Sequence, residues 1–245
     1  TVEMNPLGKF GSLVNGGTFT YVLPSPQPAS FEVTLRAEND GGTADAVWTV
    51  TRQGLPPEGE LAIAGDLIVD LQADGDDGTA GEDVWVNLAE DSPVGDFIRI
   101  GEPFLEEVDG ADAVTFNHPD FFTDDFYQST ESAPASITEL NATRSIEAWV
   151  YNPTIKGEET IVPWGKRGGP EGTNMSFNYG DNGAFGAVGH WGAPDLGWVD
   201  AGGAPGVGMW HHLVYTYDGA ATRVYADGLL ANSETPAGGL NTHPD

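Results

Sequence analysis

Apolar and polar positions alternate with a period of two over residues 210–217 and again over 222–226. Strict alternation is typical of β-strands that bury one face. An Asp-Gly pair follows each stretch, at 218–219 and at 227–228. Asp-Gly readily adopts the positive φ angles of tight hairpin turns. The pattern therefore predicts two neighbouring strands joined by a short turn, with a second turn directly after them.

Shorter stretches of the same alternation recur along the chain, separated by turn-forming residues. The sequence contains 34 Gly and 17 Pro, and we find almost no helical periodicity in it. This combination predicts an all-β fold. The further strands that we expect lie at 18–22, 31–37, 46–51, 66–71, 113–117, 145–151 and 173–179.

Several of these segments resemble one family when they are taken in order. Residues 210–219 are WHHLVYTYDG, residues 224–228 are VYADG and residues 145–150 are SIEAWV, while 113–117 and 66–71 are similar to earlier strands. Together they resemble the laminin-G-like domain, a concanavalin A-like lectin/glucanase jelly roll, over residues 62–245. The resemblance implies a two-sheet sandwich and a structural role for the adjacent histidines in WHH. It also implies a structural Ca²⁺ at the rim of the sandwich, with Asp70 and Asn117 at the matching positions.

Two expectations about domain organisation follow. In the family, further strands return to pair beside the first, so we expect the jelly roll of residues 62–245 to be incomplete at its C-terminus and the native chain to continue. Residues 1–54 resemble the second half of a bacterial Ig-like or cadherin-like surface module. Residues 55–61, rich in Gly and Pro, are expected to form the linker.

Charge excludes one class of partner. The chain has 38 acidic and 9 basic residues, with a net charge of −29, so it lacks the positive surface that nucleic acid requires. Three explanations of the acidity remain open: a solvated acidic surface, adaptation to high salt, or calcium binding. The sequence has no cysteine, which excludes disulfides. A long apolar run is also missing, so we expect no transmembrane segment.

The sequence offers one weak candidate for catalysis. Glycoside hydrolases need two carboxylates across a groove, which this fold commonly supplies as E-x-D-x-x-E on one strand. The nearest string, EVDGAD at 107–112, has a glycine inside it and ends in Asp. We therefore expect an acidic loop before strand 113–117 and no enzymatic activity.

Ligand binding has a better candidate in the stretch 173–179. Its apolar positions suit a core-facing side, and its polar positions suit hydrogen bonding to sugar hydroxyls. The glycine-rich segment that follows adds aromatic rings, which present an apolar face and a polar edge to a carbohydrate. The alternative is that these tryptophans pack in the core or at a sheet edge. The predicted ligand-binding residues are Asn174, Ser176, Asn178, His190, Trp191 and Trp198.

These observations favour a non-catalytic carbohydrate-binding or adhesion module of a larger secreted or cell-surface protein. Its partners would be a glycan or a cell-surface ligand and further domains of the same chain. The alternative is a structural spacer, an assembly protein or a surface-layer component. A glycoside hydrolase is the third and least favoured class, since a fold by itself does not determine function.

Overall fold

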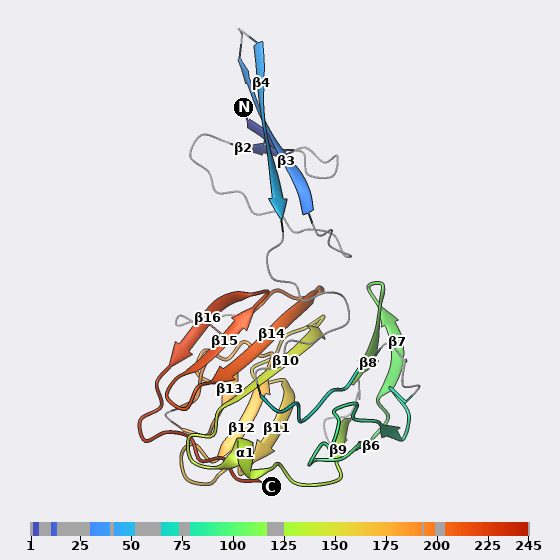
Figure 1. Cartoon of the computed structure of the whole chain (residues 1–245), viewed down its shortest axis with the longest axis vertical. Helices are drawn as coiled ribbons and strands as arrows, with labels where there is room; N and C mark the ends of the chain where they lie inside the picture. The colour runs from blue at the N-terminus through green and yellow to red at the C-terminus, as the bar shows by residue number, and fades with distance from the viewer. Residues whose placement is uncertain are drawn as a thin grey trace. The chain divides into compact units, whose positions relative to one another are not determined.

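The structure, a computed structural model, divides the chain into two compact units, Thr1–Gly65 and Asp66–Asp245. Figure 1 shows the strands of both units. The residues that the structure describes are 2–4, 11–13, 30–39, 42–51, 65–73, 79–116, 125–192, 194–198 and 204–244.

The first unit contains a four-stranded antiparallel sheet with the order β2-β1-β3-β4. Its two long strands pair over their whole length, from Ser30 opposite Thr51 to Asn39 opposite Gly42. The strands expected at 31–37 and 46–51 are therefore confirmed, while the strand expected at 18–22 lies outside the described residues. The strands are β1 (Val2–Met4), β2 (Gly11–Leu13), β3 (Ser30–Asn39) and β4 (Gly42–Thr51).

Two facing antiparallel sheets form the main body of the second unit. The first has the order β10-β14-β15-β16 and the second has the order β11-β12-β13. Figure 1 shows the strands of both sheets. Side chains from both sheets meet in one core, so this part of the chain is a β-sandwich, as the sequence predicts. The strands of the first sheet are β10 (Arg144–Tyr151), β14 (Trp210–Tyr217), β15 (Thr222–Ala226) and β16 (Leu229–Glu234). Those of the second are β11 (Thr160–Gly165), β12 (Asn174–Asn178) and β13 (Val188–Gly189).

The two Asp-Gly turns next to β15 differ in geometry. Asp227 and Gly228 both have positive φ, at 51° and 79°, and they join β15 to β16 as a two-residue hairpin turn. The connection after β14 is longer and runs from Asp218 to Ala221. Within it, the Asp218 carboxylate accepts hydrogen bonds from the backbone N–H groups of Ala220 and Ala221. These bonds and the side chain of Arg223 lower the pKa of Asp218 to about 2.

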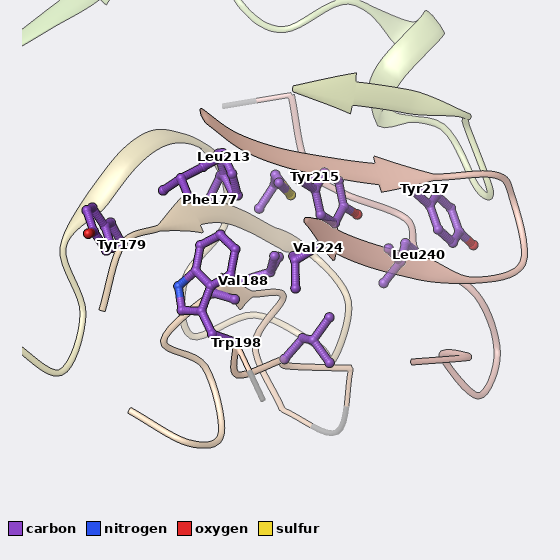
Figure 2. Close-up of a cluster of buried hydrophobic side chains, with 12 residues drawn as sticks. Phe177, Tyr179, Val188, Trp198, Leu213, Tyr215, Tyr217, Val224 and Leu240 are labelled. Atoms are coloured by element: carbon purple, nitrogen blue, oxygen red, sulfur yellow. The ribbon is translucent and has the colours of Figure 1, made fainter. Parts of the chain in front are cut away.

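The core of the sandwich lies between the two sheets (Figure 2). Successive buried residues of β14 are Leu213, Tyr215 and Tyr217, which are at most 2% exposed. Burial of this kind provides most of the stability of a domain, at about 25 cal/mol for each Å² of apolar surface removed from water. The whole cluster consists of Met175, Phe177, Tyr179, Ala187, Val188, Leu196, Trp198, Leu213, Tyr215, Tyr217, Val224 and Leu240.

The strands that precede the sandwich in the second unit form smaller sheets. One has the order β5-β6-β9 and the other is the hairpin β7-β8. A single turn of helix, α1 (Ala135–Thr138), then precedes the sandwich. The strands are β5 (Val84–Trp85), β6 (Phe97–Ile100), β7 (Phe104–Val108), β8 (Ala111–Thr115) and β9 (Phe126–Ser129).

Two sequence predictions for the stretch that precedes the sandwich, at 66–71 and at 107–112, are wrong. Residues 66–71 form no strand; the side chain of Asn87 instead bonds to Ile68 O and accepts the N–H of Asp70, in place of a strand ladder. The expected acidic loop at 107–112 is the end of a hairpin. Its tip is Asp109-Gly110, with φ of 49° and 82°, the same turn chemistry as at 227–228.

Candidate functional site

The loop that follows β13 presents the indole of Trp191 to solvent. Trp191 is 41% exposed, whereas its neighbour His190 is fully buried. Its backbone has a φ of 69°, a left-handed conformation that is unusual for a bulky residue and costs about 1–2 kcal/mol. The surrounding loop must therefore hold this residue in place.

His190 anchors the loop to the sandwich core. Its Nδ1 lies 3.0 Å from the carbonyl oxygen of Pro194, and its Nε2 lies 3.0 Å from the hydroxyl of Tyr215 on β14. Burial lowers the pKa of His190 to about 4, so the imidazole is neutral at pH 7. The ring is thus a fixed structural support and lies below the surface that carries Trp191.

Asp195 closes the same loop from its other end. The carboxylate oxygen Oδ1 accepts the backbone N–H of His190 at 2.7 Å, and the backbone N–H of Asp195 donates to Gly192 O at 3.1 Å. Burial raises the pKa of Asp195, although backbone hydrogen bonds from His190, Gly192 and Trp191 oppose the rise. These bonds stabilise the left-handed backbone at Trp191.

The turn between β11 and β12 lies against this loop and completes the site. The N–H of Gly172 donates to the carbonyl oxygen of Trp191 at 3.2 Å. A Cβ on Gly192 would lie 2.6 Å from Cγ of Glu171, and one on Gly168 would lie 4.0 Å from the indole. The missing side chain at Gly192 therefore lets Glu171 lie against the backbone next to Trp191. An exposed indole can stack on an apolar ring face, and a carboxylate on the adjoining turn can accept hydrogen bonds from hydroxyls.

The structure places most of the other predicted binding residues in the interior. Ser176 is 5% exposed, and Asn178, His190 and Trp198 are at most 1% exposed. Asn178 donates to Phe185 O at 3.0 Å and accepts from the Thr160 hydroxyl at 2.9 Å. The expected open row of polar groups on β12 is thus wrong, because these groups bond to the chain itself.

Asn174 is only partly buried, whereas Trp198 packs in the core. Asn174 is half-buried and donates to Gly189 O at 2.7 Å. The Trp198 ring packs against Phe177, with ring centroids 6.1 Å apart, as the alternative of core packing predicts. The structure therefore brings Asn174 and Trp191 to the same end of the second sheet, and Trp191 is the more exposed of the two.

Of the two predicted calcium ligands, only Asp70 lies among the residues that the structure describes. The carboxylate of Asp70 accepts hydrogen bonds from the Gln72 amide at 3.2 and 3.3 Å, and Asn117 lies outside the described residues. Among the residues that are described, no group of three or more His, Asp or Glu side chains could hold a metal ion. Calcium binding stays a prediction.

The acidic string considered for catalysis lies on the β7-β8 hairpin. Glu107 and Asp112 pair across it, and both are exposed. Glu106, beside them, accepts a hydrogen bond from Thr115 at 2.7 Å. The carboxylates of Glu107 and Asp112 are therefore exposed to solvent on a two-stranded hairpin.

Sequence reasoning missed two notable side chains on β10. Trp149 is 66% exposed, while Arg144 is 7% exposed and lies over the rings of Trp164 and Tyr217. The alternation of β10 contains the signal for both: positions 144, 146, 148 and 150 share the inner face, and 145, 147 and 149 share the outer face.

Comparison with known proteins identifies the family of the sandwich. No curated protein matches the chain. In the part of the chain that the structure describes, no helix is long and apolar enough to span a membrane. A model of the concanavalin A-like lectin/glucanases superfamily matches residues 122–245, just over half of the chain, and this range contains both sheets of the sandwich. The chain therefore belongs to the concanavalin A-like lectin/glucanases superfamily.

Proposed function

We propose that this chain is a non-catalytic carbohydrate-binding module with an adhesive role in a larger secreted or cell-surface protein. One observation carries the proposal: the indole of Trp191 is held at the surface in a left-handed backbone conformation. Backbone strain of this kind costs about 1–3 kcal/mol and clusters at binding sites. The buried His190 and the half-buried Asp195 provide the support that the strain requires.

The chemistry around Trp191 suits a sugar. A pyranose ring has an apolar face of C–H groups and a periphery of hydroxyls. The indole would stack on the former, and the Glu171 carboxylate would accept hydrogen bonds from the latter. A net charge of −29 repels polymers that carry sulfate or uronic acid, so a neutral glycan is the favoured ligand.

Affinity gel electrophoresis against soluble neutral polysaccharides tests the proposal. Barley β-glucan, galactomannan and hydroxyethyl cellulose are suitable probes. We expect at least one of them to retard the unmodified chain and Trp191→Ala to weaken that binding by about 2 kcal/mol or more, as for a binding hot spot. Leu140→Ala is the control, since Leu140 is 61% exposed and lies outside the loop.

Two results would contradict the proposal. The first is that none of the polysaccharides retards the unmodified chain, which would favour the structural spacer. The second is that Trp191→Ala lowers the free energy of unfolding by about 3–5 kcal/mol, the cost of removing a core tryptophan. A matched measurement on Trp198→Ala, at a residue that is 1% exposed, provides the scale for that comparison.

Calcium is proposed as a structural ion of the same module, with Asp70 as one ligand. Ca²⁺ should then raise the melting temperature more than Na⁺ does at equal ionic strength, by the linkage between binding and folding. Asp70→Asn should remove the part of the effect that is specific to calcium. Equal stabilisation by both ions would leave only screening of the negative charge.

A further inference from the structure

The outer face of the sheet β10-β14-β15-β16 carries a second exposed indole. Ile146 and Val150 of β10 pack against the core, so Trp149 points away from it, and it is 66% exposed. Trp149 lies directly opposite His212 of β14. The two rings are stacked, with centroids 5.1 Å apart and an angle of 30° between their planes. His212 covers one side of the indole and leaves most of the ring in solvent.

A carboxylate lies next to this stacked pair. Glu147 is two residues before Trp149, on the same face of β10, and its side chain is 50% exposed. Its Oε2 is 3.5 Å from Nε2 of His212. An indole, an imidazole and a carboxylate thus lie next to one another on a regular strand pair, whose register from Arg144 to Tyr151 contains no bulge. Because the backbone and the stacked ring fix the indole, little conformational freedom would be lost on binding.

The charged groups of the outer face argue against an acidic partner. Its arginine, Arg223, is engaged by the Asp218 carboxylate at 2.7 Å. The next outer-face residues beside Trp149 and His212 are Tyr151 and Trp210, whose ring centroids are 5.8 Å apart. The carboxylate of Glu147 lies on the other side of the indole, near the imidazole of His212. Aromatic rings with a carboxylate and an imidazole beside them match a small ligand of mixed polarity.

We propose that Trp149, His212 and Glu147 form a second saccharide subsite, which binds a neutral pyranose unit of a polysaccharide. The inference rests on the proposed carbohydrate-binding function, but it concerns a different surface. The exposed face of the indole stacks on the C–H face of the sugar, and the Glu147 carboxylate accepts a hydrogen bond from a sugar hydroxyl. His212 positions both groups through the ring stack and its proximity to Glu147.

The two subsites belong to different layers of the sandwich. Trp149 lies on the outer side of the first sheet, whereas the Trp191 loop is held by the β11-β12 turn of the second. One sugar unit therefore cannot contact both indoles, and a module with two such subsites can bind two polysaccharide chains. Multivalent attachment strengthens binding to a polymer by factors of about 10²–10⁴.

Separate removal of the two indoles tests this inference on the full chain. The assay is affinity electrophoresis with the neutral polysaccharides named above, followed by equilibrium sedimentation. We expect Trp149→Ala to weaken polysaccharide binding at least tenfold, Trp149→Phe to retain most of it, and Trp149→Ala/Trp191→Ala to abolish it. Trp149→Ala should leave the melting temperature within about 3 °C of the unmodified chain, because an exposed cross-strand pair contributes little to stability. Leu140→Ala is again the control.

The possible failures are distinguishable. If Trp191→Ala abolishes binding and Trp149→Ala has no effect, the second subsite is wrong and the proposed function stands. If Trp149→Ala converts a dimer to a monomer without changing polysaccharide binding, this face is an interface between copies, and the inference is wrong. If none of the polysaccharides binds the unmodified chain, both proposals are wrong.

Discussion

The sandwich buries the apolar side chains of its strands, whereas the small sheets that precede it leave similar side chains exposed. In the sandwich, Phe177, Leu213 and Tyr215 are completely buried. In the strands of residues 84–129, Phe104 and Leu105 are 44% and 41% exposed. The same region also exposes Val84, Ile98, Ile100, Phe116 and Phe126.

The difference shows that alternation alone does not bury a side chain. Both β6 and β14 alternate, but in β14 every second residue is buried, whereas β6 alternates between half-buried and exposed positions. A sheet buries a face only when another layer packs on it. The sandwich has such a layer, and the family match, which begins at residue 122, includes both of its sheets.

The largest expected effect contrasts two phenylalanines. Phe177→Ala should lower the free energy of unfolding by about 3–5 kcal/mol, because it leaves a cavity between the sheets. Phe104→Ala, on the exposed β7, should cost less than about 1 kcal/mol. Urea denaturation of both variants measures the two values. A similar cost for both would mean that the β7-β8 hairpin is packed as tightly as the sandwich.

The pH dependence of stability gives the next effect. Burial lowers the pKa of His190 to about 4, below the value of about 6.5 in an unfolded chain. Between pH 6.5 and 4 the unfolded state therefore binds a proton that the folded state does not, so stability falls as the pH falls, by up to about 3 kcal/mol. His190→Gln should lose this part of the slope. The two stability curves should run parallel above pH 7.5; parallel curves between pH 6.5 and 4 as well would exclude the effect.

Arg144 tests whether the sandwich depends on the contacts of a buried guanidinium group. Its Nη1 donates to the carbonyl oxygens of Ile137 and Ala142, at 3.0 and 3.1 Å. The guanidinium also lies 5.7 Å from the ring of Trp164 and 5.2 Å from that of Tyr217. Burial lowers the pKa of Arg144, an effect that the tyrosine side chains around it partly offset.

Arg144→Lys should therefore destabilise the chain by about 2 kcal/mol, because lysine lacks the planar donor fork that makes these contacts. The matched control is Arg223→Lys, on an exposed pair with Asp218, which should leave thermal unfolding unchanged. An Arg144→Lys variant as stable as the control would show that the guanidinium contacts are replaceable.

The smallest effect concerns the strained loop at the edge of the sandwich. Trp191→Gly should stabilise the chain by about 1 kcal/mol, because glycine adopts the φ of 69° without steric cost. Polysaccharide binding should decrease in the same variant. That combination would show that the indole contributes to binding and not to the stability of the chain. A loss of stability would show instead that contacts of the indole outweigh the strain. Thermal unfolding measures the change.

Most of the sandwich could be predicted from local patterns. The alternation of 210–217 and 222–226 located β14 and β15, and the Asp-Gly pairs located their turns. The predictions failed where one side chain replaced a strand ladder, as Asn87 does for residues 66–71. They also failed at the β7-β8 hairpin, where the Asp109-Gly110 signal was present but was interpreted as part of an acidic loop.

For the candidate site, the sequence determined which residues share a face but not which face meets solvent. Asn178 and Trp191 were both predicted to bind ligand, yet the first is fully buried and the second is 41% exposed. The sequence by itself determined the β-class, the positions of β10, β12, β14 and β15 along the chain and the family, because these depend on local alternation, turn chemistry and short motifs. Only the tertiary structure decided which aromatic and polar side chains remain accessible. Burial is a non-local property: it depends on whether a segment distant in the sequence packs on that face.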